Sequence, residues 1–146
     1  MTKRILYALL LTGAPVIAMA QDHKDSIALT KKRNVARVQY GVASYYHNKF
    51  EGRKTANGEV FTQKGMTAAS NTHPLNCWVR VINSRNKKSV IVRITDRMHP
   101  QNPRLIDLSR SAAAKLGYTG RGLTRVKVEY LGRQKPASDS VAEDNK

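Results

Sequence analysis

The run WVRVINSRNKKSVIVRI, from Trp78 to Ile94, decides the fold class of this 146-residue chain. Its two ends, residues 78–82 and 89–94, are rich in β-branched residues, which favour strands. The polar stretch 83–88 between them has the composition of a turn. Two such runs separated by a short polar segment predict a β-hairpin.

Further strands are predicted on both sides of this hairpin. Apolar residues stand at every second position over residues 36–42 and again over residues 126–130, which is the period of a half-buried strand. One short helix is predicted between Ser109, which can cap it, and Gly117, which can end it. Many short strands with a single helix indicate one mainly β domain over residues 35–133, either a barrel or a sandwich. The pattern alone does not choose between the two.

The N-terminal residues have the composition of a cleavable signal peptide. Lys3 and Arg4 precede an uncharged stretch, and Ala18-Met19-Ala20 offers the small residues that a signal peptidase requires. The alternative is a membrane anchor, which needs about 18 clean apolar residues, and this stretch is interrupted before that length. We therefore predict a signal peptide over residues 1–20 and export from the cytosol.

Polar segments flank the predicted domain. Residues 21–34 predict a flexible leader and residues 134–146 a disordered tail, because both have few large apolar residues. No cysteine lies near the predicted cleavage site, so a lipid anchor is not expected.

The chain is strongly basic, with 26 lysines and arginines against 10 acidic residues and a formal net charge of +16. Such a surface suits anionic neighbours, namely nucleic acid, anionic lipid or an acidic cell-wall polymer. Export makes nucleic acid the least suitable of the three. The alternative interpretation is a basic surface that serves solubility alone.

Cysteine and histidine usage excludes several kinds of site. The single cysteine, Cys77, rules out an intramolecular disulfide and a cysteine-rich zinc site. Its place in an apolar run favours a core position over a nucleophilic role. The four histidines lack the spacing of a metal site, so no metal site is predicted.

Two polar segments hold the candidate catalytic groups. The first, over residues 52–59, has the sequence GRKTANGE, and the second, over residues 93–100, places Asp96 where an apolar strand ends. A strand fixes the position of an acid at its end, while the adjoining loop opens to substrate. The alternative for Asp96 is an ion pair with Arg93 or Arg97 that orders a turn.

Several short motifs follow one another in a fixed order along the domain. They include Gly41–Tyr46, Thr55–Glu59, Met66–Ala69, Val79–Val81, Asp96-Arg97 and Ile106–Ser109. In this order they resemble the rare lipoprotein A family of septal-ring lytic transglycosylases over about residues 39–129. The resemblance implies an all-β fold, a six-stranded double-psi β-barrel with one or two short helices, related to the expansins. It also implies a peptidoglycan glycan strand as ligand and no cofactor.

The implied reaction requires only one carboxyl group. A lytic transglycosylase cleaves the bond between N-acetylmuramic acid and N-acetylglucosamine without water. A protonated acid gives its proton to the glycosidic oxygen, and the same carboxylate then takes the proton of the C6 hydroxyl, which closes a 1,6-anhydro ring. Ordinary glycosidases use two carboxyl groups instead.

The resemblance assigns this acid and base role to Asp96 and implies that Glu59 orients substrate or tunes Asp96. Tyr45 and Tyr46 would line the groove with flat rings, with packing of a strand as the alternative for each. The other predicted substrate-binding residues are Arg53, Thr55, Asn57, His73, Arg93 and Arg97. The arginines suit paired hydrogen bonds to the lactyl carboxylate of muramic acid, although each one alone is more often a surface charge.

Two departures from the family pattern lie near the predicted site. Ser70 stands where the family commonly has a histidine, and His73 follows three residues later, from where we expect it to reach the same groove. The family's Asp-Arg-Gly-Pro turn is replaced by DRMHP over residues 96–100, which lacks glycine. Both departures bear on activity more than on fold.

Together these observations predict a monomeric, exported enzyme of the periplasm, an endolytic lytic transglycosylase acting on peptidoglycan glycan strands. Division or envelope proteins are further candidate partners, whereas nucleic acid and a membrane span are not expected. One alternative is a non-catalytic, expansin-like module that binds peptidoglycan. The other is an envelope or division-site scaffold that holds partner proteins.

Overall fold

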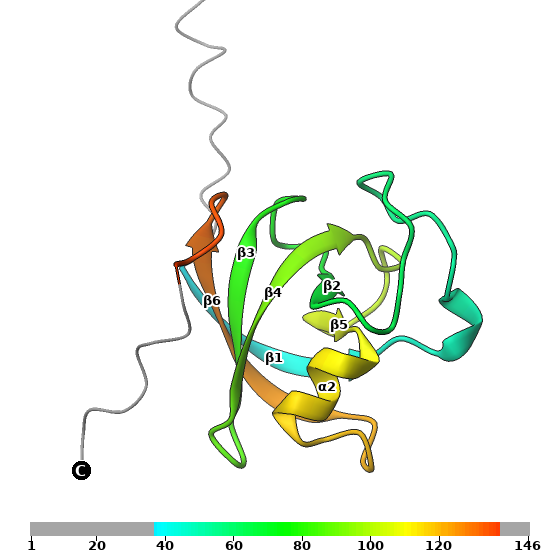
Figure 1. Cartoon of the computed structure of the whole chain (residues 1–146). Coiled ribbons are helices and arrows are strands. Elements are labelled where there is room, and N and C mark those ends of the chain that lie inside the picture. The colour runs from blue at the N-terminus through cyan, green and yellow to red at the C-terminus, as the bar shows by residue number, and fades with distance from the viewer. Residues whose placement is uncertain (1–36, 138–146) are drawn as a thin grey trace, which may run out of the picture. The chain divides into compact units, whose positions relative to one another are not determined.

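The computed structural model describes residues 37–137 (Figure 1). The predicted signal peptide, the predicted leader and residues 138–146 of the predicted tail lie outside these residues. In chain order the described elements are β1 (Val38–Tyr45), the 3-10 helix η1 (Asn48–Phe50), β2 (Thr67–Ala69), β3 (Trp78–Asn83), β4 (Ser89–Asp96), β5 (Ile106–Leu108), α2 (Arg110–Leu116) and β6 (Thr124–Gly132).

The six strands close into a barrel in the order β1-β5-β2-β4-β3-β6 (Figure 1). This confirms the predicted all-β fold with one or two short helices, and it decides between barrel and sandwich. β3 and β4 form the predicted hairpin. Two neighbouring pairs, β1 with β5 and β2 with β4, are parallel, and the other pairs are antiparallel.

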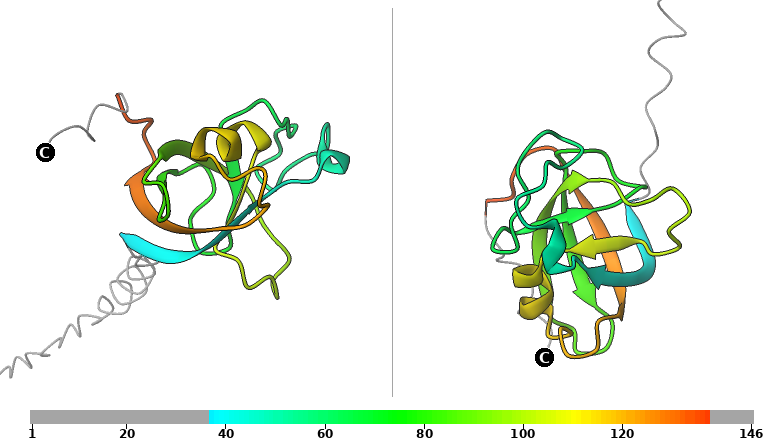
Figure 2. Two further views of the ribbon diagram at one scale, coloured as in Figure 1. Left: turned by 90° about the horizontal axis from the view of Figure 1, so that it is seen from below. Right: turned by 90° about the vertical axis from the view of Figure 1, so that its right-hand side faces the viewer.

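The short helix α2 has the predicted ends. The Ser109 side chain accepts a hydrogen bond from the backbone N–H of Ala112, and Gly117 ends the helix in the left-handed region with a φ of 73°. Its buried face, Ala112, Ala113 and Leu116, packs on the barrel. η1 and the segment around it project from the barrel beyond the end of β1 (Figure 2).

Alternate residues of the strands fill the barrel. In β3 and β4, the side chains of Val79, Val81, Val90, Val92 and Ile94 are at most 5% exposed. No helix described within residues 37–137 has the length and apolar character needed to cross a membrane.

Cys77 lies in this core, as the sequence predicts, with no exposed surface. Burial raises the pKa of its thiol to about 11, although neighbouring guanidinium groups act in the opposite direction. The thiol therefore stays protonated near neutral pH, and a protonated thiol is a poor nucleophile.

β1 faces the opposite way from what its apolar alternation indicates. Val38 is 42% exposed and Tyr40 is 74% exposed, although the pattern predicts the strand itself correctly. Residues paired across two strands share a face, and Gly41 pairs with the buried Val126 of β6. Gly41 therefore faces inward, where Leu105 fills the space that a side chain would need.

Gly41→Ala is expected to destabilise the fold by about 1–3 kcal/mol, because overpacking forces the backbone or its neighbours to shift. A Cβ atom at residue 41 would stand 2.6 Å from the Cβ of Leu105. Gly120→Ala is the matched control, since no atom lies within 4 Å of its added Cβ. Chemical denaturation measures both variants, and equal stability of the two would contradict the close contact.

Candidate functional site

A β-bulge turns Asp96 to the outer face of the barrel. Ala68 of β2 pairs with Ile94, but Ala69 pairs with Asp96, so Thr95 is an extra residue in β4. Without it, strict alternation would point Asp96 inward with Ile94. The bulge therefore places a carboxyl group at the surface, at the end of a strand that is otherwise tied into the core.

Three donors hold the Asp96 carboxyl group. The Tyr46 hydroxyl donates to Oδ2 at 2.7 Å. The backbone N–H groups of Ala56 and Arg97 donate to Oδ1 at 2.9 Å and 2.8 Å. Oδ1 thus has both lone-pair directions occupied, whereas Oδ2 keeps one for another partner.

Tyr46 belongs to an aromatic cluster beside this carboxyl group. Its ring stacks on Phe61 with centroids 4.3 Å apart and meets Phe50 edge-on at 5.6 Å. Burial raises the pKa of Tyr46 far above its usual value, and the hydrogen bond to Asp96 and the charges of Asp96 and Asp107 raise it further. Tyr46 therefore stays protonated and donates to Asp96 at all physiological pH values.

The loop with the sequence TANGE lies against the end of β4. The backbone N–H of Asn57 donates to the carbonyl oxygen of Thr95 at 3.0 Å, next to the bond from Ala56 to Asp96. Within the loop, the Thr55 hydroxyl donates to Oδ1 of Asn57 at 2.6 Å. The TANGE loop is therefore held by a hydrogen bond within itself and by hydrogen bonds to Thr95 and Asp96 at the bulge.

Glu59 lies on the same outer face as Asp96. Its carboxylate accepts from the Arg93 guanidinium at 2.6 Å. Arg93 and Asp96 pair with Thr67 and Ala69, two residues apart on β2, so their Cα atoms are about 7 Å apart. Arg93 thus pairs with Glu59, which differs from the ion pair with Asp96 weighed from the sequence.

Arg97 joins Asp96 to the segment after β2. Its guanidinium donates to the carbonyl oxygen of Ser70 at 2.5 Å, and the Ser70 N–H donates to the carbonyl oxygen of Asp96 at 3.2 Å. Arg97 therefore holds the segment 70–73 beside the catalytic candidate.

Tyr45 and Arg53 lie at the edge of this arrangement. Tyr45 points to the other side of β1, where its hydroxyl donates to the carbonyl oxygen of Thr119 at 2.9 Å and its ring meets Tyr118. Arg53 is exposed and lies over the ring of Phe50 at 5.4 Å. Of the two adjacent tyrosines, only Tyr46 contacts the Asp96 carboxyl group.

His73 is buried behind Ser70. Its Nδ1 lies 3.0 Å from the Ser70 hydroxyl, the side chain is 1% exposed, and Nε2 has no partner within the described residues. Burial, and then the charge of Arg97, lower the pKa of His73 to about 4, so the ring is neutral. The histidine thus stands next to the position that Ser70 occupies, but beneath the surface.

Asp107 is the neighbour that the sequence reasoning did not assign to the site. Ala69 pairs with Asp96 on one side and with Asp107 on the other, so the two acids flank one residue of β2 on one face. The Arg104 guanidinium donates two hydrogen bonds to the Asp107 carboxylate, at 2.8 Å and 2.9 Å. Because Asp107 stands between the apolar Ile106 and Leu108, both buried, the sequence pattern predicts that its side chain faces outward. The order of the strands, which brings Asp107 close to Asp96, cannot be predicted from the local sequence.

Within residues 37–137 no three histidine, cysteine or acidic side chains are grouped so as to hold a metal ion. The hydrogen bonds at Asp96 present an oriented carboxyl group beside a permanent hydroxyl donor.

Comparison with known proteins places these residues in a family. The family described as "Lytic transglycolase" matches residues 38–128. The chain is 48% identical over 110 residues to the endolytic peptidoglycan transglycosylase RlpA of Haemophilus influenzae, covering 74% of this chain and 38% of that protein. It is 56% identical over 91 residues to the RlpA of Pseudomonas aeruginosa, covering 62% and 27%.

The chain thus spans well under half the length of these two relatives. Among solved structures, the expansin of Clavibacter michiganensis matches with a TM-score of 0.52 and 21% identity, covering 69% of this chain and 52% of that one. This likeness concerns the fold, and it agrees with the predicted double-psi barrel.

The buried His73 predicts a pH dependence of stability. Because its folded pKa of about 4 lies below the ordinary 6.5, unfolding takes up a proton between these values, and stability falls as the pH falls through that window. At pH 5 the protonation of His73 on unfolding has lowered the free energy of unfolding by about 2 kcal/mol relative to its value well above pH 6.5. His73→Leu should remove this part of the slope between pH 7 and pH 5 in denaturation curves, whereas the exposed His99→Gln should keep it. Equal slopes for the wild type and His73→Leu would contradict the assignment.

Proposed function

Because the chain belongs to the lytic transglycolase family, we propose that its barrel cleaves peptidoglycan glycan strands between N-acetylmuramic acid and N-acetylglucosamine, leaving 1,6-anhydro ends. The observation that carries the proposal is the Asp96 carboxyl group, turned outward by the bulge and oriented by three donors. The two RlpA relatives, named as endolytic peptidoglycan transglycosylases, support the same substrate.

In the proposed reaction Asp96 acts through Oδ2. Both lone pairs of Oδ1 accept backbone N–H groups, so the proton and the glycosidic oxygen meet at the remaining lone pair of Oδ2. Oδ2 first gives its proton to the glycosidic oxygen. It then takes the proton from the C6 hydroxyl as that oxygen attacks C1, so one atom serves as acid and then as base.

Tyr46 supports this exchange as a permanent donor. When Asp96 loses its proton to the leaving oxygen, negative charge develops on Oδ2, and the bond from the Tyr46 hydroxyl strengthens. The raised pKa of Tyr46 keeps it from competing as a proton source. We therefore assign Tyr46 a positioning role on the acid rather than only a sugar-stacking one.

The exposed groups around Asp96 form the proposed substrate-binding set. Glu59 and Arg93 form a partly exposed ion pair, from which either partner can exchange to a sugar hydroxyl or a lactyl carboxylate. Thr55 and Asn57 shape the loop on one side, and Arg97 and Arg53 add positive charge nearby. Tyr45 and His73, which were expected to contact substrate, are instead proposed to support the fold of the site from below.

The proposed place of action is the bacterial envelope, where the glycan polymer lies. The predicted signal peptide and the high positive charge support this location. The relatives extend well beyond the region matched here.

Asp96→Asn is expected to lower the release of 1,6-anhydro-muramic ends from purified glycan strands at least about 100-fold. An amide keeps the shape of the side chain but has no proton to give and cannot take one up. Mass spectrometry of the digested strands measures the ends, and thermal unfolding shows whether the variant is folded. Undiminished cleavage would remove Asp96 from the reaction.

A wild-type protein that sediments with peptidoglycan and yields no anhydro ends would instead favour the binding module. The barrel would then keep a glycan-binding surface without catalysis. This outcome separates the enzyme from the expansin-like alternative.

Tyr46→Phe is expected to lower kcat roughly 10- to 100-fold with little change in KM, because the lost hydrogen bond is one to a charge that develops during the reaction. Tyr118→Phe is the matched control, since it removes a buried hydroxyl that donates to the carbonyl oxygen of Ser44 and not to Asp96. Equal losses of kcat in the two variants would point to a general packing effect.

A further inference from the structure

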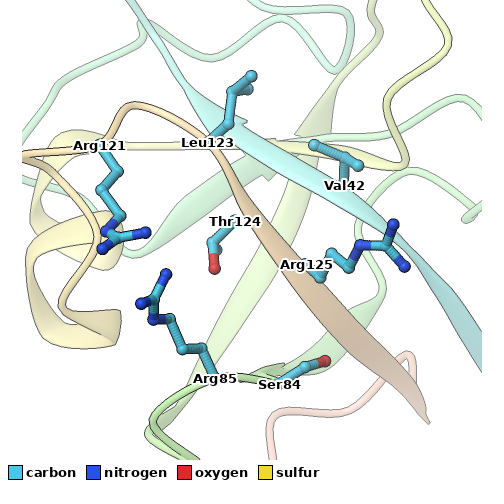
Figure 3. A pocket seen from close by; sticks show the side chains of 7 residues that line it. All are labelled: Val42, Ser84, Arg85, Arg121, Leu123, Thr124 and Arg125. Atoms are coloured by element: carbon cyan, nitrogen blue, oxygen red, sulfur yellow. The ribbon is translucent and has the colours of Figure 1, made fainter.

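A pocket lies at the end of the barrel opposite to Asp96. It has a volume of about 580 Å³ and is lined by Val42, Ser84, Arg85, Arg121, Leu123, Thr124 and Arg125 (Figure 3). These residues come from β1, from the turn between β3 and β4, from the connection between α2 and β6, and from β6 itself. We call it the arginine pocket.

The pocket is far from the candidate catalytic site. The turn between β3 and β4 precedes β4, whereas Asp96 ends this eight-residue strand, so the two ends are roughly 20 Å apart. Figure 1 shows the turn and the connection between α2 and β6 at the lower end of the barrel, and the tip of β4 at the upper end. The pocket is therefore a separate site.

Three guanidinium groups define its chemistry. The side chains of Arg85 and Arg121 extend toward one another, and Thr124 lies beside them (Figure 3). Arg125 follows Thr124 on β6 and pairs with Val42 of β1, and its side chain extends away from those of Arg85 and Arg121 (Figure 3). Arginine offers a fork of N–H donors that matches the oxygen atoms of phosphate.

No carboxylate of the described residues lines the pocket. The described part of the chain holds five acidic residues, and four of them (Glu51, Glu59, Asp96 and Asp107) belong to the catalytic end or its loops. The fifth, Glu129, forms ion pairs with Lys127 and Arg80. Arg85 and Arg121 bring two like charges toward each other, and Arg125 also lines the pocket, so an anionic ligand would stabilise these charges.

Exposed apolar side chains adjoin these cations. Four large apolar residues of the described part are exposed, and Leu123 lines the pocket at 53% exposure. Tyr40, at 74%, lines a continuous groove with Val42 and Arg125, and Val38 follows on the same face of β1. The reversed face of β1 thus places an apolar stripe next to the arginines.

We propose that this end of the barrel docks on an anionic phospholipid bilayer, with a headgroup phosphate in the arginine pocket and Leu123 and Tyr40 in the interfacial layer beside it. Free phosphate would account for the arginines but not for the apolar stripe. A bilayer surface binds both, because cations are drawn to its anionic headgroups and aromatic and aliphatic side chains enter its interface. Docking here leaves Asp96 facing away from the membrane.

The test is binding of the mature chain, from Gln21 onward, to vesicles made of equal parts phosphatidylglycerol and phosphatidylcholine. Arg85→Gln, Arg121→Gln and Arg125→Gln combined should lower the partition coefficient roughly 100-fold. Lys49→Gln, Lys64→Gln and Lys135→Gln combined are the matched control, because they remove the same charge at other places and should keep most of the binding. Sedimentation of the vesicles measures all three proteins.

A second variant tests the apolar stripe. Leu123→Ser with Tyr40→Ser changes two exposed residues, so the fold is kept, and the partition coefficient should fall roughly 10-fold. Equal binding to vesicles of phosphatidylcholine alone, or equal losses in the two arginine and lysine triple variants, would overturn the proposal.

Titration with inorganic phosphate alone tests whether the arginine pocket binds free phosphate instead of a membrane. If it shifts the arginine side-chain NMR signals while the vesicles do not bind, the pocket is a site for free phosphate and the membrane proposal is wrong. Asp96→Asn should bind the vesicles like the wild type, so failure of the docking proposal and failure of the proposed enzyme activity are distinguishable.

Discussion

The site depends on one hydrogen-bonded carboxyl group, that of Asp96, at which three parts of the chain meet. The Tyr46 hydroxyl comes from the end of β1, the Ala56 N–H from the loop before β2, and the Arg97 N–H from β4's own continuation. Most residues of the loop, over residues 52–59, are exposed, and its hydrogen bonds to Thr95 and Asp96 fix it to the barrel. The carboxyl group therefore orders the loop as much as the loop orders the carboxyl group.

The bulge at Thr95 makes this arrangement compatible with a packed core. Ile94 has no exposed surface, and two residues later Asp96 reaches the outer face. In a regular strand these residues would share one face, and an ionisable group would have to enter the barrel or Ile94 would have to leave it. One inserted residue resolves this conflict, because it places the Asp96 carboxyl group at the rim and leaves the interior apolar.

Much of the fold follows from local pattern, whereas the site does not. The hairpin of β3 and β4 and the ends of α2 follow from composition, turn residues and capping. The local pattern does not predict which face of β1 points inward. Leu105, far along the chain, occupies the space opposite Gly41, so Gly41 faces inward and Tyr40 faces outward. Asp96 and Glu59 come from recognisable motifs, but the proximity of Asp107 and the burial of His73 arise from strand order and packing, which no short window of sequence records.

The distribution of acidic residues links the two ends of the barrel. The described residues have 19 lysines and arginines and only five acids, so most cations lack an acidic partner. Four of those acids lie at the end of the barrel that holds Asp96 or in its loops, and Glu129 forms ion pairs with Lys127 and Arg80. The opposite end keeps its guanidinium groups available around a cavity. A surface of this kind gains from an anionic partner, and a barrel held at that end would present the oriented carboxyl group of the other end to a glycan strand.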